Sequence, residues 1–104
     1  MKIIKDLKNR DIRFSDEREE HITNDHPEMI GQYDKIKATL ADPLIIVESK
    51  TDRNVELFYS HHEKTPVTEK YLCVVVKALQ NDLFIITAYF TDTIKKGEVL
   101  WRKK

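Results

Sequence analysis

The sequence predicts an α+β domain in which helices pack on one face of an antiparallel sheet. Two observations predict it. Apolar residues recur at helical spacing in the first half of the chain, whereas the second half holds runs of β-branched and aromatic residues between turn-forming residues. With 104 residues, of which 40% are hydrophobic and 35% charged, the chain can bury one modest core, so residues 1–104 are expected to form a single domain.

The two ends of the chain are basic, although the whole chain has no net charge. Residues 1–14 hold five basic and two acidic side chains and are expected to form an arm or a short strand. Residues 95–104 hold five basic and one acidic and are expected to form a tail, which leaves eight basic and fifteen acidic residues between the ends. If both ends flank one face of the sheet, they would attract a phosphate backbone despite the neutral total.

Two helices are predicted after this N-terminal arm. Ser15 is a typical helix N-cap, and the acidic residues that follow it complement the positive end of a helix, which predicts a helix over 16–24. Pro27 suits the first position of a second helix, whose apolar residues recur at helical spacing over 28–41. We expect that helix to end before Pro43.

Four strands are predicted in the second half of the chain. Turn-forming residues separate them, and the Val-Val-Val and Phe-Ile-Ile runs are apolar on both faces, as is typical of central strands. The predicted strands cover 44–48, 55–59, 69–78 and 83–91.

The composition excludes several classes of protein. A single cysteine, Cys73, excludes an internal disulfide and a Cys-rich zinc site, and the apolar run around it predicts a buried thiol. With Gly31 and Gly97 as the only glycines, the chain has no P-loop and no dinucleotide-binding fingerprint. No apolar stretch approaches the ~20 residues of a membrane span and no signal-peptide core is present, so we expect a soluble cytoplasmic protein without a membrane partner.

Polar side chains gather on one face of the strand over 83–91. Its even-numbered residues are wholly apolar and are expected to meet the helices, so its odd-numbered residues would face away from them. This outward set ends in two hydroxyls and a phenol, those of Thr87, Tyr89 and Thr91. If Lys77 on the preceding strand lies on the same face of the sheet as Thr87, it would form a cluster with these three side chains. Because Thr, Tyr and Lys also occur on ordinary exposed sheet faces, a purely structural role is the alternative.

Histidines lie at the junction of the two predicted helices. At a helix N-terminus, His26 would be held neutral and able to accept a proton near pH 7, and the free amides there would bind a phosphate. His21 lies nearby in the sequence, and a capping or packing role is the alternative for both. His61 and His62 are adjacent and point to opposite faces of an extended chain, with no third ligand at a recognisable spacing, so no metal site is predicted.

Three motifs in this order carry a family resemblance. They are His-Pro-Glu at 26–28, Tyr-Leu-Cys-Val-Val-Val-Lys at 71–77 and Thr-Ala-Tyr-Phe-Thr at 87–91, and His21 precedes the first of them. Over residues 12–101 the chain resembles the phage-type nucleases of the barnase, EndoU, colicin and RelE group. The resemblance implies two N-terminal helices packed on one face of a four-stranded antiparallel sheet, and RNA cleavage that needs no metal and no cofactor.

The resemblance also implies roles for the matched residues. His21 or His26 would take the proton from a ribose 2′-hydroxyl or protonate the leaving 5′-oxygen. Lys77 would stabilise charge on the phosphate in the transition state. Thr87 and Tyr89 would hold the phosphate or assist proton transfer. The expected substrate-binding residues are Tyr71, Thr91, Trp101 and Arg102.

The leading prediction is therefore an endoribonuclease that leaves a 2′,3′-cyclic phosphate. A toxin of phage or mobile-element origin is one form that it would take, with an antitoxin or immunity protein as its partner. The alternative from another class is a catalytically inactive module that binds RNA or a protein through the same sheet face, with Tyr71, Tyr89 and Trp101 as stacking groups. A third possible function is that of an accessory protein whose open sheet face forms the interface of a homodimer.

Overall fold

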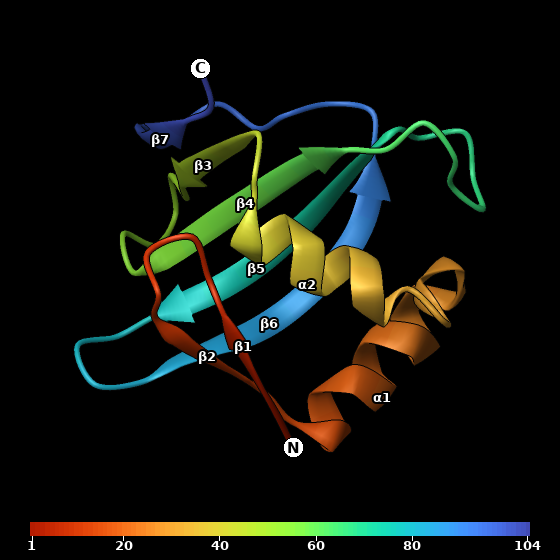
Figure 1. The fold of residues 1–104 in the computed structure, drawn as a ribbon, viewed down its shortest axis with the longest axis horizontal. Coiled ribbons are helices and arrows are strands. Elements are labelled where there is room, and N and C mark those ends of the chain that lie inside the picture. Colours follow the sequence, from red (N-terminus) through yellow and green to blue (C-terminus); the bar gives the residue numbers. More distant parts are fainter.

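The computed structural model describes residues 1–104 as two α-helices and seven strands (Figure 1). The first strands are β1 (Lys2–Lys5) and β2 (Asp11–Phe14). The helices are α1 (Asp16–Asp25) and α2 (Tyr33–Ala41), with the 3₁₀ turn η1 (Pro27–Met29) between them. The remaining strands are β3 (Ile45–Glu48), β4 (Val55–His61), β5 (Tyr71–Ala78), β6 (Leu83–Thr91) and β7 (Val99–Arg102).

The sheet is larger than predicted and is mixed. All seven strands form one sheet in the order β1-β2-β6-β5-β4-β3-β7, with β2 parallel to β6 and all other neighbours antiparallel. The prediction of a four-stranded antiparallel sheet is therefore wrong. The helices are not N-terminal either, because residues 1–14 form the β1–β2 hairpin ahead of them. The expected tail over 95–104 contains β7, which forms the opposite edge of the sheet.

The helix boundaries follow local chain chemistry. Ser15 caps α1, since its Oγ accepts a hydrogen bond from the Arg18 backbone N–H at 3.1 Å. The second helix begins at Tyr33 rather than at residue 28, because Gly31 (φ 78°) adopts the left-handed conformation and interrupts the chain between η1 and α2. Ile30 lies in this interruption and is exposed. Neither helix is long and apolar enough to cross a membrane.

The main core lies between the helices and one face of the sheet, called here the helix side. The helices cross this face in Figure 1, where α2 lies over β4 and β5 and α1 lies at the β6 side. Ile22 of α1 and Ile36 and Leu40 of α2 are buried there. The sheet contributes fully buried side chains from its central strands, among them Ile46, Phe58, Leu72, Val74, Val76 and Ala88.

A bulge in β6 changes which side chains face the helices. The β5–β6 register shifts between Val75 and Val76, which pair with Thr87 and Ile85, so that Ile86 has no partner on β5. Ile85 therefore packs into the helix-side core, while Ile86 packs against the cluster on the other face. This reverses the prediction for these two residues and for Leu83, which packs against the helix-side core, because strict alternation assumes a strand without an extra residue. Beyond the bulge, the predicted alternation holds.

The opposite face of the sheet, called here the outer face, is partly covered rather than open. The connection over residues 92–98 crosses it, because β6 and β7 lie on different sides of β3, β4 and β5 in the sheet. The Lys95 backbone N–H donates to the Tyr59 hydroxyl at 3.1 Å. Gly97 approaches β3 so closely that a Cβ there would lie 2.3 Å from the Glu48 carbonyl oxygen. Beneath the connection is a second apolar cluster of Ile45, Val47, Val55, Leu57, Tyr59 and Cys73.

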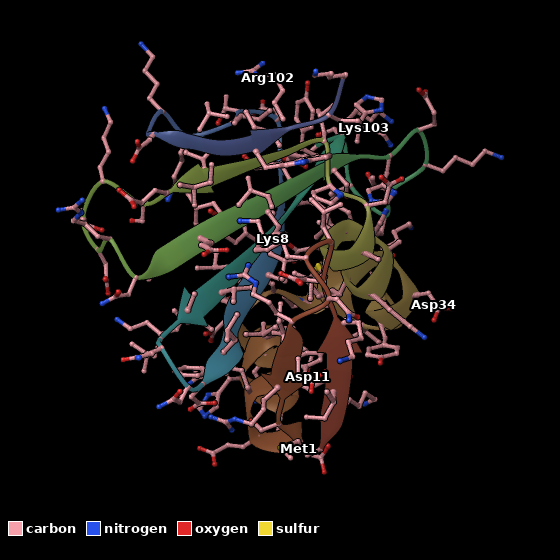
Figure 2. All side chains as sticks on the ribbon, turned by 60° about the vertical axis from the view of Figure 1, so that its left-hand side comes forward. Met1, Lys8, Asp11, Asp34, Arg102 and Lys103 are labelled. Carbon is pink, nitrogen blue, oxygen red and sulfur yellow. The ribbon has the colours of Figure 1, made fainter.

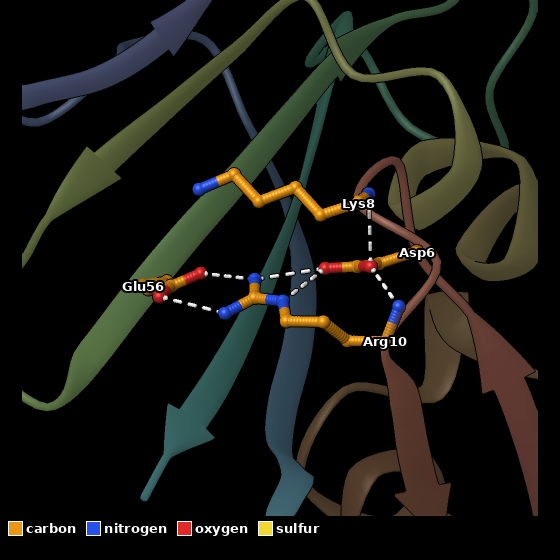
Figure 3. Close-up of polar contacts among 4 residues, drawn as sticks. All are labelled: Asp6, Lys8, Arg10 and Glu56. Carbon is orange, nitrogen blue, oxygen red and sulfur yellow. Dashed lines mark hydrogen bonds and ion pairs between the residues drawn. The ribbon is translucent and has the colours of Figure 1, made fainter. Parts of the chain in front are cut away.

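The β1–β2 turn is fastened to β4 by a charged network (Figure 3). The fully buried Asp6 carboxylate accepts hydrogen bonds from the Lys8 and Arg10 backbone N–H groups and from Arg10 Nε, at 3.0, 2.8 and 2.8 Å. Arg10 Nη2 also donates to Glu56 at 2.7 Å. Burial lowers the pKa of Arg10, but the hydrogen bonds to Glu56 and Asp6 outweigh it and raise the pKa overall. The hairpin therefore curls toward β4 on the helix side.

Candidate functional site

A cavity of about 580 Å³ opens on the outer face. It lies between the β3–β4 turn and the 92–98 connection, and Thr87 and Tyr89 line it from β6. The hydroxyls of Ser49 and Thr51 in the turn, 3.1 Å apart, also border it. Its remaining apolar lining, called here the floor, comes from β4, β5 and β6 and consists of Val55, Leu57, Val75 and Ile86.

Three lysines line the same cavity. Lys50 comes from the β3–β4 turn, whereas Lys95 and Lys96 come from the 92–98 connection. All three are exposed and none forms an ion pair with a carboxylate. The cavity therefore combines an apolar floor with uncompensated positive charge, which favours an anionic ligand.

Lys77 is close to the cavity but is engaged elsewhere. Its ammonium forms an ion pair with Asp52, which does line the cavity. The hydrogen bond from Lys77, together with one from the Asn54 backbone N–H, holds the pKa of Asp52 below its usual value. Asp52 is therefore a charged partner that neutralises Lys77, and the free cations at the cavity are Lys50, Lys95 and Lys96.

His26 is brought against Tyr89. The two ring centroids are 5.7 Å apart with planes tilted by 33°, and His26 is partly exposed. The ring Nδ1 lies 3.8 Å from a Glu28 carboxylate oxygen. Because Tyr89 both contacts His26 and lines the cavity, it connects the imidazole to the lysine-lined space. His26 ends α1, where its backbone N–H donates to the Ile22 carbonyl, and only η1 follows. The predicted phosphate site on the amides of a regular helix is therefore absent.

His21 is not part of this arrangement. It lies on the exposed side of α1, where its Nε2 is 3.8 Å from a Glu17 carboxylate oxygen, and it does not line the cavity. Of the two histidines predicted as acid or base, only His26 contacts a residue of the cavity lining, Tyr89.

Cys73 lies between two phenols on the outer face. It pairs with Tyr59 on one neighbouring strand and with Tyr89 on the other, and it is fully buried, as predicted. Burial raises the pKa of the Cys73 thiol to about 11 and also raises the pKa of Tyr89. Tyr89 therefore keeps its proton and can donate a hydrogen bond over the whole physiological pH range.

The predicted substrate-binding residues are divided between two parts of the molecule. Tyr71 and Thr91 pair across β5 and β6 on the outer face, and the Tyr71 ring packs edge-on against His61 at 5.5 Å. Trp101 instead packs against the helix-side core from β7. Arg102 is exposed on the same edge strand, at the opposite end of the molecule from Met1 (Figure 2). Neither β7 residue lines the cavity.

The two basic ends of the chain do not flank a common face. They lie at opposite ends of the molecule (Figures 1 and 2). The basic residues of 1–14 are also largely paired with carboxylates, through contacts of Lys2 with Glu19, Lys5 with Asp11, Arg10 with Asp6 and Glu56, and Arg13 with Asp82. Of these two basic segments, only the one after β6 brings free lysines to the cavity.

Sequence reasoning identified Thr87 and Tyr89 but named none of the three cavity lysines as a site residue, although Lys95 and Lys96 belong to the basic segment expected to attract a phosphate backbone. The signal for two of them was the pair Lys95-Lys96 before Gly97, since a glycine in a polar loop marks a close approach of the backbone to another segment. No signal pointed to Lys50, because it lies in an ordinary turn between two strands.

No family model matches the chain, and no curated protein or solved structure does so either. No group of three or more His, Cys, Asp or Glu side chains is placed to hold a metal ion. The arrangement on the outer face offers a protonated phenol, hydroxyls and free ammonium groups around one cavity, and an imidazole in contact with that phenol. These groups can bind a phosphate and exchange protons with the atoms bonded to it.

Proposed function

We propose that the protein is a metal-independent endoribonuclease whose reaction centre is the outer-face cavity beside His26. The contact between His26 and Tyr89, at the border of a cavity with three free lysines, is the observation that carries the proposal. Cleavage of RNA by its own 2′-hydroxyl needs only a positioned proton acceptor, a proton donor and positive charge, because the nucleophile belongs to the substrate.

Each group then has a role in a balanced reaction. His26 takes the proton from the 2′-hydroxyl as that oxygen bonds to phosphorus. The bond from phosphorus to the 5′-oxygen breaks, and the leaving oxygen takes a proton from solvent water, which gives a 2′,3′-cyclic phosphate and a 5′-hydroxyl. The hydroxide that remains takes the proton from the protonated His26 and restores the neutral imidazole. Lys95 and Lys96 stabilise the charge on the phosphate oxygens, and Thr87 and Tyr89 donate hydrogen bonds to them. Lys77 acts only through its ion pair with Asp52 in this scheme.

The test is cleavage of an RNA oligonucleotide by the full chain in EDTA. We expect products that end in a 2′,3′-cyclic phosphate, and no cleavage when the nucleotide at the cut site is 2′-deoxy. His26→Ala is expected to reduce the rate by about 10²-fold or more, as for loss of a general base. The double variant Lys37→Ala/Lys64→Ala, which removes two exposed lysines outside the cavity, is expected to leave the rate unchanged. An inactive native chain, or a His26→Ala rate equal to the native rate, would overturn the proposal.

RNA binding without turnover is the second candidate function. It is favoured because only one histidine, His26, contacts a residue of the cavity lining, since His21 pairs with Glu17 and the pKa of Tyr89 is raised. A reaction that needs both a proton acceptor and a proton donor would then lack one of them. Binding of RNA that persists while no cyclic-phosphate product forms would support this candidate over the enzyme.

A further inference from the structure

The cavity has two chemically different parts. Its floor is apolar, and Val55 and Leu57 are 8% and 5% exposed, so they are fixed by the packing of the sheet. Its other lining includes the exposed lysines and the hydroxyls of Ser49, Thr51 and Thr87. A phosphate group alone would leave the apolar floor unused, because such a surface gains free energy only by burying an apolar ligand.

The cavity has the size of a site for a ligand, or a part of a ligand, no larger than a small molecule. Pockets for ligands of drug size span about 300–1,000 Å³ and are lined mostly by apolar side chains with a few polar groups that fix orientation. The volume of about 580 Å³ falls in this range. It exceeds the need of a lone phosphate, and a double helix is too wide to enter it.

The charged lining favours a ligand that carries an anionic group beside its apolar part. Lys95 and Lys96 have no carboxylate partner, and neither has Lys50 across the cavity. The one carboxylate in the lining, that of Asp52, is already paired with Lys77. A ligand with a flat apolar ring and a phosphate would satisfy the floor and the lysines at once.

We propose that the cavity holds one unpaired nucleotide of the RNA, with its base on the floor of Val55, Leu57, Val75 and Ile86 and its phosphate at Lys95 and Lys96. The hydroxyls of Ser49, Thr51 and Thr87 meet the polar edge of the base or the ribose. A base inside the cavity must leave its stack and its pair, so the preferred substrate is single-stranded RNA. This inference rests on the proposed function, because it assigns the substrate class of the same site.

The test measures binding of small probes to the full chain by NMR titration. A nucleoside 5′-monophosphate is expected to bind at least tenfold more tightly than ribose 5-phosphate, which lacks the base, or inorganic phosphate. Lys95→Ala/Lys96→Ala and Val75→Asp are each expected to weaken nucleotide binding at least tenfold. Val99→Asp, the same change at an exposed apolar residue of β7, serves as the control and should bind as the native chain does. Val75→Thr keeps the size of the side chain and should weaken binding severalfold if Val75→Asp does not fold.

The possible outcomes separate this inference from the proposed function. Equal affinity for the nucleotide and for ribose 5-phosphate, or no nucleotide binding, would overturn the base pocket even if RNA is cleaved. Nucleotide binding that depends on Val75 and on the two lysines would support it even if no cleavage occurs. A duplex that competes for the cavity as well as the matching single strand would contradict the assigned substrate class.

Discussion

Arg10 and Glu56 face each other across the helix side of the sheet, with Arg10 Nη2 2.7 Å from a Glu56 carboxylate oxygen. Arg10 also binds the fully buried carboxylate of Asp6, so one guanidinium joins the β1–β2 turn to β4. Arg10→Ala would leave a buried carboxylate without its charged partner. We expect it to lower the free energy of unfolding by about 3 kcal/mol, measured by urea denaturation.

The matched control for Arg10 is Lys8→Ala in the same turn. The Lys8 backbone N–H binds Asp6, but its side chain forms no ion pair, and the backbone contact survives the substitution. We expect a change within about 0.5 kcal/mol. Equal losses from the two substitutions would contradict the role assigned to the guanidinium.

The two glycines are expected to respond differently to alanine. At Gly97 a Cβ would meet the Glu48 carbonyl oxygen at 2.3 Å and Val47 Cγ1 at 2.7 Å, so Gly97→Ala must displace the connection that carries Lys95 and Lys96. We expect a loss of about 1–3 kcal/mol in the free energy of unfolding, together with weaker binding at the proposed RNA site. At Gly31 there is open space but a positive φ, so Gly31→Ala should cost about 1 kcal/mol and leave RNA binding unchanged. Urea denaturation and an RNA titration of both variants test this contrast.

The proposed RNA site predicts that the cavity lysines determine how binding depends on salt. Each lysine that contacts a phosphate of a single strand contributes about 0.7 to the slope of log affinity against log salt concentration. Lys95→Ala/Lys96→Ala is therefore expected to reduce that slope by about 1.4, measured from titrations at several salt concentrations. Lys37→Ala/Lys64→Ala has the same net charge as Lys95→Ala/Lys96→Ala, but it should keep the salt dependence of the native chain.

His62 should make the protein less stable in mild acid. Its Nε2 lies 2.8 Å from the Ser60 hydroxyl, and burial lowers its pKa, with further lowering by the charges of Lys35 and His61. The unfolded chain protonates His62 more readily than the folded chain does. The contribution of neutral His62 to the free energy of unfolding is therefore fully present above the ordinary histidine pKa of 6.5 and is lost as the pH falls below it. Urea midpoints at pH 7.5 and 5.5 should differ more for the native chain than for His62→Gln. An identical pH dependence of the two chains would refute this assignment.

The elements with a strong local pattern could be predicted from the sequence, and most of the short ones could not. The N-cap at Ser15 located α1, and long runs of β-branched and aromatic residues located β5 and β6. In contrast, β1, β2 and β7 have four residues each, and their brief alternation does not distinguish a strand from an arm or a tail. Their conformation depends on partners far away in the sequence, such as the pairing of Ile12 with Leu83. The strand β3 is equally short, but its continuous apolar run and the turn-forming residues after it made it predictable.

The candidate site was predictable only where it follows from a single strand. Alternation placed Thr87 and Tyr89 on the outer face, and the structure agrees. The order of strands in the sheet decides which loop crosses that face, and no local pattern encodes this order. The lysines at 95 and 96 therefore reached the cavity from a segment that was interpreted as a tail. The contact of His26 with Tyr89 depends on how α1 packs against β6, which is equally non-local.

The parallel pairing of β2 with β6 also has a kinetic consequence. The sheet is complete only when Ile12 pairs with Leu83 and β3 pairs with β7. Many native contacts therefore join residues that are far apart in the sequence. Chains dominated by such contacts close large loops before the contacts repay the lost entropy, and they fold in milliseconds to seconds rather than microseconds. The hairpin and meander of β3 to β6 can form from neighbouring segments alone. The two outer parts of the sheet then dock onto it as a later step.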